Sequence, residues 1–220
     1  MKRVLVQAGH NPPREPGFES GTGTAGEIEY VHDMSQRVLA LLKKDGRFEG
    51  IYAPGDIPNG IQVDAAIFLH CDGSSSPSAT GYSFGFPADP VNAKLADWLD
   101  LEFKKIPNHP PHHADNYTAD LRGYYGFSRV DSPGPEVLIE HGFLTNPKDR
   151  EWLMTHRSRI ARAEYNALCR YFGLEPRKQK VVYKLFADGH LYARGSLRFV
   201  TRFARDKLGK AKRIVIKKKR

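Results

Sequence analysis

Two hydrophobic periods alternate along the first 175 residues of the chain. Short runs of apolar residues are typical of strands, and they occur at residues 3–7, 64–70, 81–86 and 135–140. Apolar residues at spacings of three and four are typical of helices, and they occur at residues 24–45, 91–105 and 147–172. Strands that alternate with helices predict an α/β domain with layered elements.

The pattern changes after residue 175. The sequence predicts a linker at residues 173–180, a hairpin across Asp188-Gly189, a basic helix near residues 198–207 and a last strand at 214–216. This segment contains too many Val, Leu, Ile, Phe and Tyr side chains for a disordered tract. We therefore expect two domains, 1–175 and 176–220, the second a small basic α+β unit with the element order ββαβ.

Charge separates the same two segments. The chain has a formal net charge of +9, and 16 of its 34 Lys and Arg residues lie in 177–220 beside only two acids. The tail therefore carries about +14 and the remainder about −5. A segment this basic favours a polyanionic partner, such as nucleic acid, a membrane surface or an anionic wall polymer.

The N-terminus and the cysteines bear on where the protein is made and on whether it contains a disulfide. No run approaches the roughly 20 apolar residues of a membrane span, and the N-terminus lacks the apolar stretch of about 7–15 residues that an export signal needs. We therefore expect synthesis in the cytoplasm and release by other means. Cys71 and Cys169 lie in apolar segments and are expected to be packed thiols.

Three predicted strands are each followed by a residue that can bind a metal or transfer a proton. These residues are His10, His70 and Glu140. In open α/β sheets, sites form beyond the C-terminal ends of the strands. A single histidine in such a position is more often structural, but three strands that end in this way favour one shared site.

Glu27 is a fourth candidate because of its place on the first predicted helix. Positions 27, 31, 34, 38 and 41 form one helical stripe whose other members are apolar, so Glu27 lies on the edge that faces the core. A buried carboxylate requires a partner. A competing interpretation is a capping box of Thr24 and Glu27 at the helix start. Glu29, on the predicted solvent face, remains the alternative ligand.

Two histidines and one carboxylate suit a catalytic zinc site with an open position for water or substrate. Zinc lowers the pKa of its water toward about 7 and polarises a carbonyl, and a nearby carboxylate such as Glu140 can carry the proton. These parts suffice for amide hydrolysis. Cys71 and His141 adjoin the candidates, but strand alternation points neighbouring side chains to opposite faces. The three histidines at 107–113 are more typical of a solvated Pro-rich loop, which can still contact substrate.

Four segments carry a resemblance to a known family. They are Val6-Gln-Ala-Gly-His10, Gly26-Glu27, Ala66-Ile-Phe-Leu-His70 and Val137-Leu-Ile-Glu140-His-Gly-Phe-Leu-Thr-Asn146-Pro-Lys-Asp149. They resemble the motifs of the zinc-dependent N-acetylmuramoyl-L-alanine amidases, which include bacterial cell-wall amidases and many phage endolysins. The resemblance covers about residues 1–172 in order and spacing, and its last segment is the most specific.

The resemblance implies a fold, a cofactor and a set of roles. It implies an α/β domain with a mostly parallel twisted sheet flanked by helices. It implies Zn2+ bound by His10, Glu27 and His70, with Glu140 as the catalytic carboxylate. The chain departs from the family pattern at residues 11–17, which replace a Gly-rich stretch, and at residues 71–73. These departures concern the substrate more than the metal.

The chemistry of these residues does not choose between amide bonds, but the resemblance favours hydrolysis of the amide between the lactyl group of N-acetylmuramic acid and L-alanine in bacterial peptidoglycan. The basic domain would hold the enzyme on an anionic wall polymer, and a phage endolysin released through a membrane pore is the expected setting. One alternative is a zinc peptidase that cuts the stem peptide. Another is a nucleic-acid-binding protein acting through the basic tail, although the tail contains no recognition signature.

Overall fold

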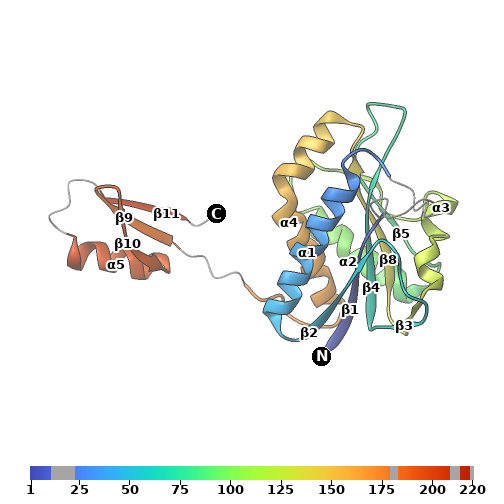
Figure 1. The fold of residues 1–220 in the computed structure, drawn as a ribbon, viewed down its shortest axis with the longest axis horizontal. Helices are drawn as coiled ribbons and strands as arrows, with labels where there is room; N and C mark the ends of the chain where they lie inside the picture. Colours follow the sequence, from blue (N-terminus) through green and yellow to red (C-terminus); the bar gives the residue numbers. More distant parts are fainter. Residues whose placement is uncertain (11–22, 179–182, 209–213, 219–220) are drawn as a thin grey trace. The chain divides into compact units, whose positions relative to one another are not determined.

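Figure 1 shows the computed structural model, which describes residues 1–10, 23–178, 183–208 and 214–218. The chain divides into two compact units, Met1–Pro176 and Arg177–Arg220. The departure from the family pattern at residues 11–17 lies outside the described residues, and so do residues 179–180 of the predicted linker. None of the helices in the described part combines the length and apolar character needed to cross a membrane.

A six-stranded sheet forms the centre of the first unit. Its strands are β1 (Lys2–Ala8), β2 (Phe48–Pro54), β4 (Ala65–Asp72), β5 (Tyr82–Gly85), β6 (Pro111–His113) and β8 (Glu136–Phe143). Their order is β2-β1-β4-β8-β5-β6, and every neighbouring pair is parallel except β5 and β8. The sheet confirms the predicted α/β fold with mostly parallel strands.

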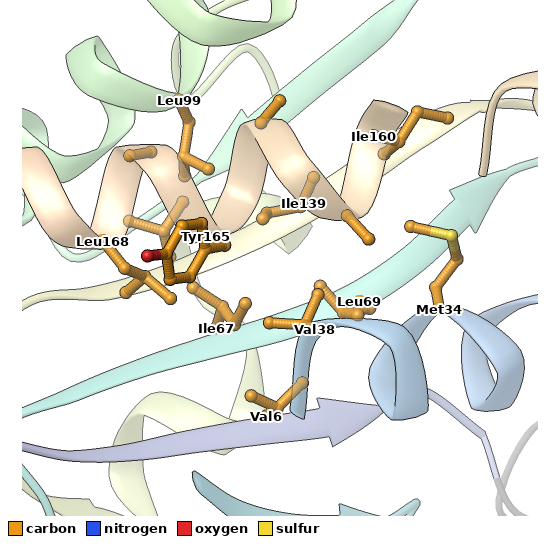
Figure 2. Close-up of a cluster of buried hydrophobic side chains, with 14 of the residues drawn as sticks. Val6, Met34, Val38, Ile67, Leu69, Leu99, Ile139, Ile160, Tyr165 and Leu168 are labelled. Carbon is orange, nitrogen blue, oxygen red and sulfur yellow. The ribbon is translucent and has the colours of Figure 1, made fainter. Parts of the chain in front are cut away.

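Three helices cover one face of this sheet. They are α1 (Glu27–Asp45), α2 (Pro90–Phe103) and α4 (Pro147–Tyr171). Side chains alternate along each strand, so that Val4 and Val6 of β1 face the helices while Leu5 between them faces the other way. Figure 2 shows how Ile67, Leu69 and Ile139 meet helical side chains in the larger core. Each fully buried aliphatic side chain stabilises the fold by about 1.5–3 kcal/mol.

The opposite face carries a smaller core under connecting segments. Leu5, Phe68 and Leu138 pack there against the short helix α3 (Ala119–Arg122) and the 3-10 helix η1 (Tyr125–Ser128). A two-residue pair of strands, β3 (Ile61–Gln62) and β7 (Val130–Asp131), lies beside them. In Figure 1, α3 lies on the side of the sheet away from α1 and α4. This thinner layer covers the face on which the candidate residues of β4 and β8 lie.

Several element boundaries differ from the sequence-based expectation. β4 and β8 do not end at His70 and Glu140 but continue to Asp72 and Phe143, because the two strands still pair with each other there across an irregularity in register. Strand β2 was not predicted at all, because Phe48–Pro54 mixes exposed and buried positions at a sheet edge. Part of the predicted Pro/His loop forms the edge strand β6.

The second unit is a small α+β fold, as predicted. Its elements are β9 (Tyr183–Ala187), β10 (His190–Gly195), α5 (Leu197–Lys207) and β11 (Ile214–Lys218). The three strands form an antiparallel sheet in the order β10-β9-β11, with the predicted turn at Asp188-Gly189 between β9 and β10. The core consists of Leu185, Ala193, Val200 and Ala204. Ser196 accepts a hydrogen bond from the Phe199 amide and thereby caps α5.

Candidate metal centre

The register of the sheet places His70 and Glu140 side by side. His70 of β4 pairs with Glu140 of β8, and both lie an even number of residues from side chains of the smaller core, Phe68 and Leu138. Both side chains therefore point to the face away from the three helices. Cys71, one residue further, belongs to the core on the helical face, and so alternation separates it from His70.

His10 reaches the same edge from the end of β1. Its backbone has a φ of 59°, an uncommon left-handed conformation for a residue with a side chain. The preceding residue must be glycine, because a Cβ on Gly9 would lie 2.3 Å from Cε1 of His70. The two histidine rings meet edge to face, with their centroids 5.0 Å apart. The backbone is therefore strained at His10 and packs closely against the His70 ring. Backbone strain of this kind concentrates at functional sites.

Glu27 uses its two carboxylate oxygens for two different tasks. Oε2 accepts a hydrogen bond from the Thr24 amide at 2.9 Å, which is one half of the predicted capping box. The other half is absent, because α1 begins at Glu27 and its N-cap is Gly26, which has a φ of 88°. Oε1 accepts a hydrogen bond from the Cys71 amide at 2.8 Å and faces the histidines. The cap and the candidate ligand therefore coexist in one side chain, and Glu29 is exposed.

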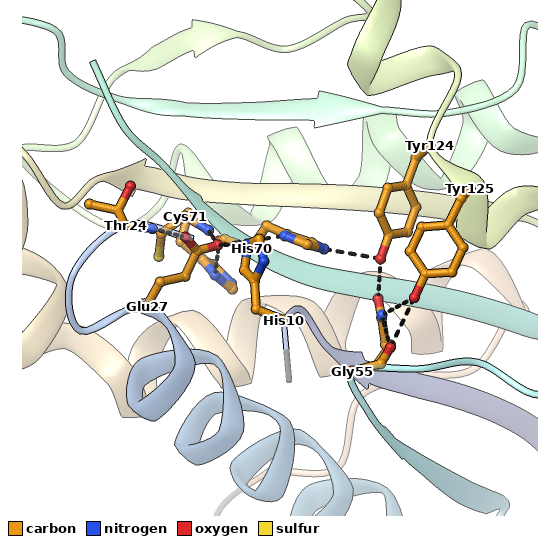
Figure 3. Close-up of polar contacts among 10 residues, drawn as sticks. His10, Thr24, Glu27, Gly55, His70, Cys71, Tyr124 and Tyr125 are labelled. Carbon is orange, nitrogen blue, oxygen red and sulfur yellow. Dashed lines mark hydrogen bonds and ion pairs between the residues drawn. The ribbon is translucent and has the colours of Figure 1, made fainter. Parts of the chain in front are cut away.

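Three donor atoms converge in a space that suits a metal ion (Figure 3). Oε1 of Glu27 lies 3.1 Å from Nε2 of His10 and 3.5 Å from Nδ1 of His70. A tetrahedral zinc ion with ligands at about 2.0–2.1 Å separates its ligand atoms by about 3.3 Å. The observed separations fit that spacing. Within the described residues, His10, Glu27 and His70 are the one group of this kind.

The electrostatics of the cluster keep the donors in the forms that metals bind. Burial alone would raise the pKa of Glu27, but the nearby His10 and His70 rings and a hydrogen bond from the Cys71 amide outweigh it and hold the pKa at about 2. Burial lowers the pKa of His70. An ionised carboxylate and a neutral imidazole are what a cation site requires.

A hydrogen-bond chain behind His70 favours a proton on Nε2 of its ring. It begins at the backbone carbonyl of Gly55, which can only accept, and the amide nitrogen of Gln7 donates to it. Oε1 of Gln7 therefore faces Tyr124, whose hydroxyl donates to it at 2.8 Å. The Tyr124 oxygen is then left to accept from Nε2 of His70 at 3.2 Å.

This chain leaves the lone pair of His70 on Nδ1, the nitrogen that faces Glu27. Groups that orient a metal-binding histidine in this way are a regular part of metal sites. The sequence patterns gave neither Tyr124 nor Gln7 a role at the metal centre. Gln7, a polar residue inside a buried strand, was the one signal that the sequence offered.

Glu140 lies beside the cluster in a setting that favours its protonated form. It is 9% exposed, and its Oε2 atom is buried without a hydrogen-bond partner. Burial raises its pKa well above the usual value, and the charges of Asp72 and Glu27 raise it further. A carboxyl group poised near a cluster of metal-binding donors can take up and release a proton as the local charge changes.

The remaining histidines do not join this cluster. His109 is buried, not solvated as expected: its ring stacks on Trp152 with centroids 4.0 Å apart, and Nε2 donates to the carbonyl of His141. His112 and His113 are exposed on β6. His141 points to the helical face and contacts Glu164 at 2.6 Å. Cys71 and Cys169 are buried free thiols, as predicted.

Comparison with known proteins gives a consistent picture. The family model described as N-acetylmuramoyl-L-alanine amidase matches residues 4–170. The probable cell wall amidase LytH of Staphylococcus epidermidis is 25% identical over 179 residues, which cover 78% of this chain and 58% of LytH. This chain thus spans little more than half the length of the curated relative.

Solved structures share the fold at lower identity. The catalytic domain of CwlV, an N-acetylmuramoyl-L-alanine amidase from Bacillus (Paenibacillus) polymyxa var. colistinus, superposes with a TM-score of 0.59 at 17% identity, over 80% of this chain and 100% of CwlV's. The catalytic domain of the CD27L endolysin, which targets Clostridia difficile, gives 0.57 at 16% identity over the same shares.

Proposed function

The chain belongs to the N-acetylmuramoyl-L-alanine amidase family, and from that premise we propose that it hydrolyses the amide between the lactyl group of N-acetylmuramic acid and L-alanine in bacterial peptidoglycan. We further propose Zn2+ as its cofactor, held by His10, Glu27 and His70. Residues 1–175 would form the catalytic domain, and residues 176–220 a domain that binds the cell wall.

One observation supports the zinc proposal above all others. The histidine donor atoms lie 3.1 and 3.5 Å from Oε1 of Glu27, close to the spacing of tetrahedral zinc ligands, and all three donors lie within 4.8 Å of one another. Glycines at positions 9 and 23 keep the surrounding space open, because a Cβ at either position would come within 2.3 Å of His70 or Glu27. A bound zinc ion would polarise the carbonyl and make its water acidic.

The proposed role of Glu140 follows from its position and its protonation. Without a bound cation, burial and then the charges of Asp72 and Glu27 raise the pKa of its carboxyl group well above the usual value. With a cation held by the cluster those charges would be offset, and Glu140 would then act as the base that removes a proton from the attacking water. As the carbon–nitrogen bond breaks, Glu140 returns that proton to the L-alanine nitrogen, which leaves as an amine.

Digestion of purified peptidoglycan tests the reaction. The zinc-loaded protein should expose new L-alanine amino groups, detected by labelling of N-termini, and a chelator should abolish them. Amines from any other stem residue would instead identify a peptidase, the alternative that the sequence left open.

Glu140→Gln separates the chemistry from metal binding. We expect turnover to fall by about 10²–10⁴-fold, since a positioned acid–base group contributes about that much. Zinc affinity should persist, because Glu140 is not among the three clustered donors. His10→Ala is the matched control and should lose both zinc and activity. A Glu140→Gln variant that turns over substrate at the original rate would contradict the role.

We propose a phage endolysin as the biological setting. The fold is shared with the catalytic domain of the CD27L endolysin, and the basic tail suits retention on an anionic wall after release. Production of the protein in a host bacterium with and without a membrane-pore protein tests this setting. Lysis that depends on the pore would support an endolysin, and lysis independent of it would contradict release through a pore.

A further inference from the structure

Three basic residues lie side by side across the sheet of the second unit. Lys184, on the central strand β9, pairs with Arg194 of β10 on one side and with Lys217 of β11 on the other. Directly paired residues on neighbouring strands point to the same face of a sheet. The three cations therefore form one row, with neighbouring strands about 4.8 Å apart.

This row lies on the face that α5 does not cover. Leu185, the next residue of β9, pairs with Ala193 and Ile216, and all three belong to the core with α5. Alternation therefore turns Lys184 and its partners away from that core. Arg194 and Lys217 are exposed, and Lys184 is half-buried.

An apolar row runs beside the cationic row on the same face. Phe186 of β9 pairs with Leu191 of β10 and with Val215 of β11. Leu191 is 42% exposed. The Lys217 ammonium lies 5.5 Å from the centroid of the Phe186 ring, which places the two rows in direct contact. We call these six residues, Lys184, Phe186, Leu191, Arg194, Val215 and Lys217, the basic face.

Stability does not account for this arrangement. Like charges that lie directly opposite each other on a sheet destabilise it. Lysines on edge strands often prevent unwanted pairing with other sheets, but Lys184 is on the central strand. A row of cations on the middle of a small sheet, beside a half-exposed phenylalanine, is retained at a cost in folding, as is common for binding sites.

We propose that the basic face binds a wall polymer built from phosphodiester-linked polyol or sugar units. The row Arg194–Lys184–Lys217 matches successive phosphates of a chain that crosses the strands. The row centred on Phe186 offers an apolar surface to the C–H groups between those phosphates. This inference rests on the proposed function, because a domain joined to a peptidoglycan amidase meets polymers attached to the wall.

Two triple variants of the full chain test the site, and both remove the same number of positive charges. The first is Lys184→Gln, Arg194→Gln and Lys217→Gln on the basic face. The control is Arg198→Gln, Arg202→Gln and Arg205→Gln, which removes the same charge from exposed positions of α5. Binding is measured in a Glu140→Gln background, which keeps the wall intact. The probes are Gram-positive sacculi, the same sacculi stripped of phosphodiester polymers with hydrofluoric acid, and a single-stranded DNA oligonucleotide.

The basic-face variant should bind untreated sacculi at least about tenfold more weakly, and the control within about twofold of the parent. The parent should lose a similar amount of binding when the sacculi are stripped. Its affinity for stripped sacculi should match the affinity of the basic-face variant for untreated sacculi. Thermal unfolding checks the fold, and the basic-face variant should unfold at or above the parent temperature because a repulsion has been removed.

Equal losses in both variants would show a dependence on net charge alone and overturn the site. Undiminished binding by the basic-face variant, or by stripped sacculi, would also overturn it. A loss confined to DNA binding would assign the face to nucleic acid instead. Cleavage of stripped sacculi by the same triple variants without Glu140→Gln is recorded separately, so failure of the amidase proposal is distinguishable from failure of this one.

Discussion

A single hydroxyl group, that of Tyr124, decides how His70 presents itself to a metal ion. Tyr124→Phe would remove the acceptor for Nε2 of His70 and the donor for Gln7, and the ring would lose its preference for one tautomer. We expect zinc affinity to fall by about 10–100-fold, the usual effect of losing a group that orients a metal ligand. Competition with a chromogenic chelator measures the affinity.

Tyr125→Phe is the matched control for this prediction. The Tyr125 hydroxyl belongs to the same network, but it donates to the Gly55 carbonyl at 3.0 Å and accepts from Gln7 rather than contacting the His70 ring. Zinc affinity should therefore change little. Nitrogen NMR of the zinc-loaded protein gives a second readout, and the His70 proton is expected on Nε2 in the parent. A proton on Nδ1, or equal zinc affinity in both variants, would refute the assignment.

Sequence patterns reach some of these residues and not others. The meeting of His10, Glu27 and His70 could be predicted, because each lies where an element begins or ends and strand ends gather at one edge. Their roles remain predictions. The partnership of Gln7 with Tyr124 could not be predicted, because the two are far apart in sequence and their contact depends on how a connecting segment folds over the sheet.

Among the elements, β8 contains a carboxyl group that works against folding. Glu136, at its first position, is 8% exposed, and its Oε2 is buried without a hydrogen-bond partner. Burial, and then the charge of Asp89, raises its pKa from 4.5 to about 7. Because the folded pKa lies above the unfolded one, stability is fully present below about pH 4.5 and declines as the pH rises through 7.

Glu136→Gln should remove that decline. At pH 8 we expect a gain in the free energy of unfolding on the order of 2 kcal/mol, and at pH 4 little change. Thermal unfolding at the two pH values measures the difference. Glu151→Gln, the same substitution at an exposed position of α4, is the control and should show no such dependence. A gain of equal size at both pH values would contradict the assigned cause.

Element types were more predictable than element limits. The three long helices and the central strands have strong periodicity, and the structure contains them. β4 and β8 extend beyond their apolar runs because pairing between neighbours continues past the last buried side chain. β2 lies at an edge and lacks a clear apolar pattern, so only its pairing with β1 reveals it.

At the scale of the whole molecule, the division into two units predicts that zinc stabilises one of them alone. All three clustered donors lie in Met1–Pro176. Zinc at 100 times its dissociation constant contributes about 2.7 kcal/mol, which raises the unfolding temperature of a unit of this size by roughly 5–10 °C. Removal of zinc with a chelator should reverse the rise.

Hydrogen exchange, resolved by segment, measures this prediction. Protection should increase with zinc in the strands and helices of the first unit and stay constant in β9, β10 and β11. Mg2+ at the same concentration serves as the control ion and should change neither unit. Equal gains in protection in both units would contradict separate stabilisation.

The shared carboxylate of Glu27 has a consequence for the lifetime of the protein. One oxygen holds the Thr24 amide at the start of α1, and the other belongs to the donor cluster. If zinc binds there as proposed, its loss should loosen the first turn of a helix that packs against the central sheet. Segments that open in this way are where cellular proteases begin to degrade a chain. The abundance of the protein, and not only its activity, is then expected to follow the supply of zinc.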